Sequence, residues 1–301
     1  MEPEQINVTK VPWYKFKVTK NNGKVLAFWQ FLAATIIILG AIFILVNAVM
    51  SDSDADNSST VAEESASDQD CNVTGIELHG DVVTYISPAD YNTEGKLTED
   101  ETASENVVYA IREGEKDDKI KAILIEIDSY GGSAVAGEEI AVALKNAKKP
   151  TVALIRGAGD SAAYWAATGA NRIFASKNSD VGSIGVTMSY LDNSTQNIKD
   201  GMTYNQLSSG KFKDAGSPDK VLTGEEKNLF MRDVNIINQN FIKAVSDNRK
   251  IGIEKVTSLA DGSTMLGEAA LSNGLIDQVG GRPEVDQYLK EKIGAEPEIC
   301  W

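Results

Sequence analysis

The sequence predicts an α/β fold preceded by a single transmembrane helix. From about residue 72 onward, short apolar runs such as Ala122–Ile127 alternate with longer helical stretches. Continuously apolar strands that alternate with helices are typical of a buried sheet covered by helices. The apolar stretch at residues 26–50 lies before this alternation and is long enough to cross a bilayer.

Length and charge narrow the range of functions. The 301 residues suit one large domain or two small ones, and 42% hydrophobic with 24% charged residues is ordinary for a globular protein. The net charge of −15 argues against nucleic acid as a partner, because binding to phosphates needs basic patches. An acidic surface also serves solubility, which needs no functional explanation.

Charge asymmetry orients the predicted transmembrane helix. Five lysines precede it, whereas residues 52–70 contain seven acidic residues and no basic one. The positive-inside rule then places the N-terminus in the cytoplasm and the rest of the chain outside, at the cell membrane. A cleaved signal peptide is the alternative, but its apolar core would be shorter, roughly 7–15 residues. We expect a cytoplasmic segment at 1–25, the span at 26–50, a flexible acidic linker at 51–71, a folded domain at 72–296 and a tail at 297–301.

The two cysteines, Cys71 and Cys300, bracket the folded region. A disulfide between them would suit an oxidising compartment, and two unrelated free thiols are the alternative. Two thiols cannot form a structural zinc site of the CxxC type, so we expect no metal and no cofactor.

The alternation assigns elements in order along the chain. The predicted strands are Ile76–Leu78, Val82–Ile86, Ala122–Ile127, Val152–Ile155, Arg172–Ala175 and Ile184–Met188. The predicted helices are Ala103–Glu113, Ala134–Lys148, Ser161–Gly169, Thr223–Arg249, Ile253–Leu259, Gly267–Asn273 and Glu284–Ile293.

Ser161 is the candidate nucleophile. It stands where an apolar strand ends in glycines and a helix of small residues begins, so backbone N–H groups are free to receive an oxyanion. The only histidine is His79, in a strand-like stretch, and a Ser-His-Asp triad would depend on it. We therefore expect a lysine base, whose pKa must fall from ~10.4 toward ~7–8. Tight helix packing alone would also explain the small residues.

Three further runs carry polar groups that could serve such a site. Asp128–Ser133 holds paired glycines after a strand, Val181–Val186 holds a glycine-flanked serine, and Leu207–Gly216 holds two lysines in a loop. Paired glycines let the backbone turn sharply and approach a ligand, but they also occur in purely structural turns.

In this order and spacing, the four runs resemble the signal peptide peptidase A (protease IV) family of membrane-anchored serine peptidases, in its short single-unit form. The resemblance covers roughly residues 75–285 and includes Lys119–Ser133, Lys148–Val152 and Asp261–Asp277. It implies a crotonase/ClpP-like β-β-α spiral. It also implies a homo-oligomeric ring in which neighbouring subunits share each site, and hydrophobic peptide substrates such as signal-peptide remnants.

The resemblance also implies a role for each matching residue. Ser161 matches the nucleophile, Lys213 the general base of a Ser-Lys dyad, and Ser183 the serine that orients the lysine. The N–H groups of Gly131 and Ala162 match the oxyanion hole.

The chain departs from the family pattern in two places. Tyr130 stands where the family usually has proline, and Asp160-Ser161-Ala162-Ala163 replaces a common Ala-Ser-Gly-Gly. Two alternatives to a serine endopeptidase stay open. One is an acyl-CoA enzyme of the crotonase fold, which an extracytoplasmic location disfavours, and the other is an inactive scaffold of the same fold.

Overall fold

The computed structural model describes residues 70–90, 97 and 99–301. These residues belong to one compact unit, Asp68–Trp301, and a second unit comprises Met1–Ser67. The predicted cytoplasmic segment and membrane span, and the linker apart from its last two residues, lie outside the described residues. Within the described part, no helix is both long and apolar enough to cross a membrane.

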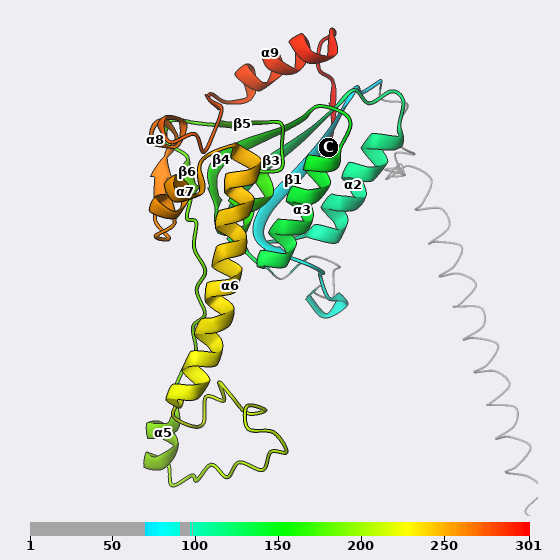
Figure 1. The fold of residues 1–301 in the computed structure, drawn as a ribbon. Helices are drawn as coiled ribbons and strands as arrows, with labels where there is room; N and C mark the ends of the chain where they lie inside the picture. Colours follow the sequence, from blue (N-terminus) through cyan, green and yellow to red (C-terminus); the bar gives the residue numbers. More distant parts are fainter. Residues whose placement is uncertain (1–69, 91–96, 98) are drawn as a thin grey trace, which may run out of the picture. The chain divides into compact units, whose positions relative to one another are not determined.

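A nine-stranded sheet forms the centre of the described unit, and its longest path runs β2-β1-β3-β4-β5-β8 (Figure 1). Its pairings are parallel except for the antiparallel pair β6–β7. The strands are β1 Val73–Val83, β2 Glu101–Ala103, β3 Ala122–Gly132, β4 Thr151–Asp160, β5 Arg172–Ala175, β6 Asp180–Gly182, β7 Thr264–Leu266, β8 Gln278–Val279 and β9 Ile299–Cys300.

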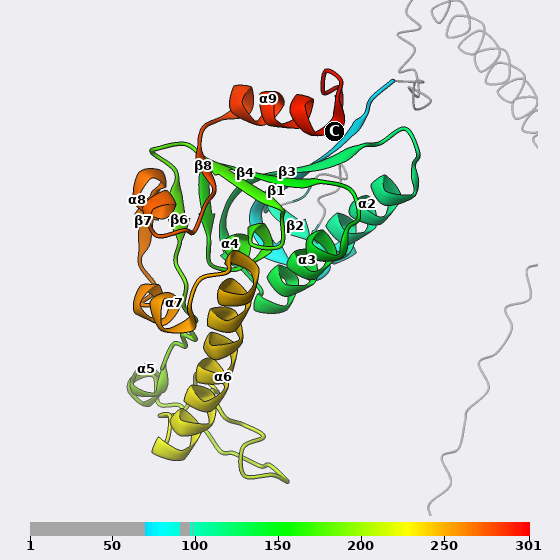
Figure 2. The ribbon, with the colours of Figure 1, turned by 45° about the horizontal axis from the view of Figure 1, so that its top comes forward.

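Helices cover both faces of this sheet. The helices of the described unit are α2 Ser104–Lys116, α3 Ala134–Asn146, α4 Ser161–Ala167, α5 Ser194–Lys199, α6 Gly224–Arg249, α7 Ile253–Leu259, α8 Gly267–Ser272 and α9 Arg282–Ile293, with a 3₁₀ turn at Pro88–Asp90; α5 alone lies away from the sheet (Figure 1). Helix α9 lies on the face opposite to α2, α3 and α4 (Figure 2). Ile123 and Ile125 of β3 join the core under α2–α4, whereas Leu124 joins the core under α9. A strand buried on both faces reads as an uninterrupted apolar run, as it does here.

The predicted α/β class is confirmed, with two corrections to the strands. The predicted strands Ile76–Leu78 and Val82–Ile86 are largely one strand, β1, whose register shifts between His79 and Asp81. The predicted strand Ile184–Met188 is wrong, because these residues pair with no strand of the described unit and become exposed from Thr187 onward.

The two ends of the described unit are joined. Cys71 and Cys300 form a disulfide, and β9 pairs with β1 beside it. The Asn72 amide donates to Glu296 O at 2.8 Å and accepts from Glu298 N at 3.0 Å. Residues 297–301, which the sequence analysis set apart as a tail, therefore contribute a strand to the sheet.

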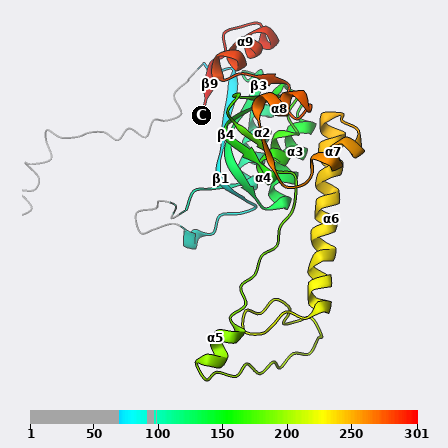
Figure 3. The ribbon, with the colours of Figure 1, turned by 90° about the vertical axis from the view of Figure 1, so that its left-hand side faces the viewer.

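Residues 187–223, here called the arm, run alongside α6 and include α5 (Figure 3). The arm ends at a capping box, in which Thr223 and Glu226 exchange hydrogen bonds at the start of α6. The Lys220 ammonium and the Thr223 N–H, both bonded to Glu226, lower the pKa of that carboxyl to about 2. Apolar burial in α6 is confined to its last turns, at Phe241, Ile242 and Val245.

Candidate active site

Ser161 occupies a left-handed backbone conformation, with φ 50°, at the junction of β4 and α4. Residues with a side chain rarely adopt this conformation, and such strain collects at functional sites. Every residue from Ala162 to Ala167 is buried. A Cβ on Gly137 of α3 would lie 2.5 Å from the carbonyl oxygen of Ala162, so the two helices touch. The small residues after Ser161 therefore allow α4 to pack closely against α3. Ser161 itself stands at the N-terminal end of α4.

Gly131 and Gly132 form a turn that only glycine can make beside Ser161. Their φ angles are 116° and 150°, and a Cβ on Gly131 would lie 2.7 Å from Ser161 Cβ and 3.1 Å from Ala162 N. The Gly131 N–H donates to Ser129 Oγ at 3.1 Å, and Ser129 Oγ donates to Gly80 O at 2.6 Å. The structure thus brings together Gly131 and Ala162, the two residues predicted to form the oxyanion hole. In this structure the Gly131 N–H donates its hydrogen bond to a neutral hydroxyl, that of Ser129.

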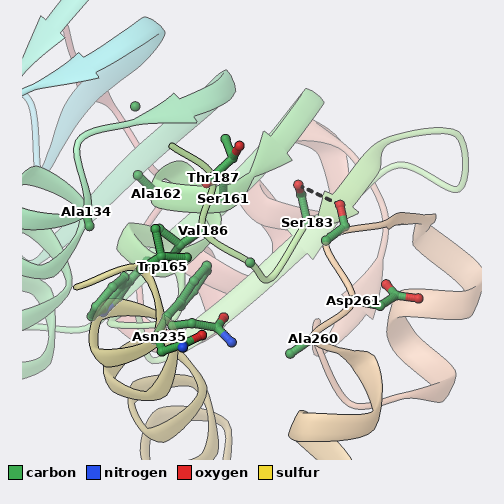
Figure 4. A pocket seen from close by; sticks show the side chains of 16 residues that line it. Ala134, Ser161, Ala162, Trp165, Ser183, Val186, Thr187, Asn235, Ala260 and Asp261 are labelled. Atoms are coloured by element: carbon green, nitrogen blue, oxygen red, sulfur yellow. Dashed lines mark hydrogen bonds between the residues drawn. The ribbon is translucent and has the colours of Figure 1, made fainter. Parts of the chain in front are cut away.

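Ser183 follows β6 as Ser161 follows β4. Because Asp160 pairs with Gly182 in the parallel ladder, both serines emerge at the same end of adjacent strands. Ser183 is also left-handed, with φ 48°, and its Oγ donates to Gly262 O at 3.1 Å (Figure 4).

Ser161 and Ser183 line one cavity of about 530 Å³ (Figure 4). Its wall includes the rings of Trp165 and Phe241, which stack with centroids 4.8 Å apart. The remaining lining residues are Gly132, Ala134, Ala162, Gly185, Val186, Thr187, Val234, Asn235, Asn238, Ala260, Asp261 and Gly262. The cavity combines these aromatic rings with polar side chains, and its apolar wall suits an apolar substrate side chain.

The wall that α6 contributes to the cavity was not predicted from the sequence. Val234, Asn238 and Phe241 recur at i, i+4 and i+7 and so share one face of the helix. That spacing was visible in the sequence. Nothing in it indicated that this face would meet Ser161, which lies more than 70 positions earlier.

Lys213 lies away from this cavity. It belongs to the arm and its side chain is exposed. Its backbone N–H donates to Gly210 O at 3.1 Å. The arm reaches the end of α6 that is remote from the sheet (Figure 1). One copy of the chain therefore does not bring Lys213 to Ser161, and Lys213 as the base stays a prediction. His79 does not line the cavity either; its backbone N–H and carbonyl bond to the Thr102 hydroxyl.

The two departures from the family pattern differ in their surroundings. The Tyr130 side chain is exposed, whereas Asp160 is buried and does not line the cavity. Burial, followed by the negative charge of Asp180, raises the pKa of Asp160 to about 6. The carboxylate therefore does not obstruct a substrate in the cavity.

Comparison with known proteins adds independent information. Residues 143–296 match the model of peptidase family S49. The chain is 33% identical to protein MJ0651 of Methanocaldococcus jannaschii over 214 residues, which are 70% of this chain and 69% of that protein. It is 34% identical to Protease 4 of Salmonella typhi over 193 residues, 62% of this chain and 30% of that protein.

Two more similarities were found. The chain is 31% identical to the chloroplastic serine protease SPPA of Arabidopsis thaliana, over 63% of this chain and 28% of that protein. A solved mutant of ClpP1 from Listeria monocytogenes matches with a TM-score of 0.44 and 13% identity, over 70% of this chain and 92% of the other. The chain thus spans about a third of the two longer relatives. It belongs to peptidase family S49, which confirms the signal peptide peptidase A (protease IV) family predicted from the sequence.

Proposed function

We propose that this protein is a serine endopeptidase in which Ser161 attacks the peptide carbonyl and Lys213 acts as the general base. The observation that supports Ser161 is its left-handed position on the wall of the cavity, next to the glycine-only turn. Left-handed backbone at a strand-to-helix junction is the geometry that exposes a nucleophilic hydroxyl above a sheet.

The reaction follows from these groups. Lys213 Nζ removes the proton of Ser161 Oγ, which bonds to the carbonyl carbon and gives a tetrahedral oxyanion. The N–H groups of Ala162 and Gly131 donate to that oxygen, the latter after leaving Ser129 Oγ. Because a charge-assisted hydrogen bond is roughly twice as strong as a neutral one, this exchange favours the transition state. The lysine then returns the proton to the leaving amine, and water hydrolyses the acyl-enzyme.

The base would come from a second copy of the chain in a homo-oligomeric ring. Lys213 lies on the arm, which exposes many large apolar side chains that a neighbouring copy would cover. They are Met188, Tyr190, Leu191, Ile198, Met202, Tyr204, Leu207, Phe212 and Val221. Ser183 would then orient the incoming lysine.

The location proposed is the outer face of the cell membrane, with residues 26–50 as the anchor. The Cys71–Cys300 disulfide supports this, because disulfides persist in oxidising compartments. Hydrophobic peptides such as signal-peptide remnants are the proposed substrates, since the cavity offers Trp165, Phe241 and Val234.

Fluorophosphonate labelling of the full-length protein tests the nucleophile and the base. We expect labelling of the wild type and none of Ser161→Ala or Lys213→Ala. Lys211→Ala is the matched control, because it removes a lysine two positions away that pairs with Glu225. Labelling that persists in Ser161→Ala would contradict the assignment of the nucleophile.

Mixing the two inactive variants tests the shared site. A Ser161→Ala subunit retains the lysine and a Lys213→Ala subunit retains the serine, so mixed oligomers should regain peptide cleavage. Absence of any recovery would show that both groups come from one chain, and a wild type that cleaves no peptide would identify an inactive scaffold.

A further inference from the structure

Asp160 is a buried acid next to the proposed nucleophile. It ends β4, and only 4% of its surface is exposed. It occupies the N-cap position of α4, yet its side chain makes no capping hydrogen bond. Its Oδ1 is buried and has no hydrogen-bond partner among the described residues. A carboxylate in such a place lacks the compensation that buried charges normally have.

A second carboxyl shares the face of the sheet on which Asp160 lies. Asp180 of β6 pairs with Ala158 of β4, and side chains two residues apart on a strand point to the same face. Asp160 and Asp180 are therefore diagonal neighbours. Asp180 Oδ1 accepts a hydrogen bond from Thr264 of β7 at 3.3 Å. The strand on the other side, β3, contributes the exposed Asp128, which accepts from the Ala158 N–H at 3.0 Å.

These surroundings determine when Asp160 is charged. Burial is the larger cause and the charge of Asp180 the smaller, and together they raise the pKa of Asp160 to about 6. No lysine or arginine within the described part of the chain opposes that rise. Asp160 is therefore a neutral acid below about pH 6 and a carboxylate above it.

The charge on Asp160 bears on the step that Ser161 performs. The oxyanion would form beside the Ala162 N–H, two residues after Asp160 in the chain. Negative charges on Asp160 and on the oxyanion would repel each other across this short stretch of chain. Because Asp160 does not line the cavity, it acts on the transition state by charge and not by contact with the substrate.

We propose that Asp160 modulates Ser161 through its charge, so that the neutral acid permits acylation and the carboxylate slows it. This inference rests on the proposed function, because it requires Ser161 to be the nucleophile. It gives the chain a dependence on acidity that the serine and lysine alone do not explain.

The test compares Asp160→Asn with the wild type, both full-length, by the rate of fluorophosphonate labelling between about pH 5 and pH 8. Dividing the two labelling rates removes every pH dependence that the two proteins share. The labelling rate of the variant divided by that of the wild type is expected to be near one at the acidic end of this pH range and about ten at the basic end. Its midpoint should lie near 6, where Asp160 titrates.

Two further variants make the result specific. Asp180→Asn removes the neighbouring charge and should move the inflection in the pH profile of the labelling rate to lower pH. This variant tests the inference even if Asp160→Asn does not fold. Asp118→Asn is the matched control, because Asp118 is exposed in the turn after α2. Its ratio to the wild type should stay near one throughout.

The outcomes separate the inference from the proposed function. A labelled wild type with a ratio that does not change with pH would assign Asp160 a purely structural role and overturn the inference alone. A ratio below one at the basic end would overturn it too, since the carboxylate would then assist. A folded wild type that is labelled at no pH would overturn both. Infrared difference spectra of wild type against Asp160→Asn provide a readout besides activity: absence of a protonated-acid carbonyl band at about pH 5 would also overturn the inference.

Discussion

Replacing Gly131 with alanine should abolish most activity and also lower the free energy of unfolding. The added Cβ would lie 2.7 Å from Ser161 Cβ, whereas ordinary contact begins near 3.4 Å, so the turn or the serine must move by about 0.7 Å. A displacement of about 1 Å in a catalytic constellation costs about 100-fold in rate, or about 2.7 kcal/mol of transition-state stabilisation. The φ of 116° adds backbone strain of about 1–3 kcal/mol to the folded state.

A second glycine separates the two effects. Gly294 has φ 75° after α9, and an added Cβ would meet nothing within 4 Å. Gly294→Ala should therefore lower the free energy of unfolding only through backbone strain and should keep the full labelling rate. Fluorophosphonate labelling rates and thermal unfolding of both variants measure the difference. Wild-type labelling by Gly131→Ala would refute the placement of this turn beside the reacting serine.

Three further predictions concern stability and the oxyanion turn. Replacing Cys71 and Cys300 with serine should lower the free energy of unfolding by about 5 kcal/mol, because the bond closes a loop spanning 229 positions; denaturant unfolding with and without reductant measures this. Glu226 has a lowered pKa, so its contribution to stability is present above the ordinary glutamate pKa of 4.5 and is lost as pH falls toward about 2. Glu226→Gln should remove that acid dependence, measured by circular dichroism, and an unchanged acid transition would count against the role of the capping box. Ser129→Ala should lower the free energy of unfolding by about 1–3 kcal/mol by leaving the buried Gly131 N–H without its acceptor. Its labelling rate should not fall, and a tenfold loss would show that Ser129 holds the turn for catalysis.

Much of the fold was predictable because its core elements are long and strongly patterned. The apolar run beginning at Ala122 became β3, and the helix over Ile253–Leu259 has the predicted bounds. The predicted break near Gly80 reflects a bulge in β1, where polar residues interrupt the apolar pattern without ending the strand. Strands of two or three residues, such as β8 and β9, are too short to show any periodicity.

The candidate site was predictable where it depends on local backbone. Ser161, Ser183 and Gly131 each follow or end a strand, and parallel strands bring such ends to one edge. The wall from α6 was not predictable, because it depends on how a distant helix packs. The position of Lys213 depends on an assembly of several chains, which one sequence does not encode in its local patterns.

The disulfide has a consequence for how the protein responds to being cut. Cys71 and Cys300 close 229 positions into a covalent ring that contains the exposed arm. A single cleavage of the arm would therefore linearise this ring without releasing a fragment, and the nicked protein would separate only after reduction. Gels run with and without reductant would distinguish nicked from intact chains, and a domain that remains whole in an oxidising compartment would come apart in a reducing one.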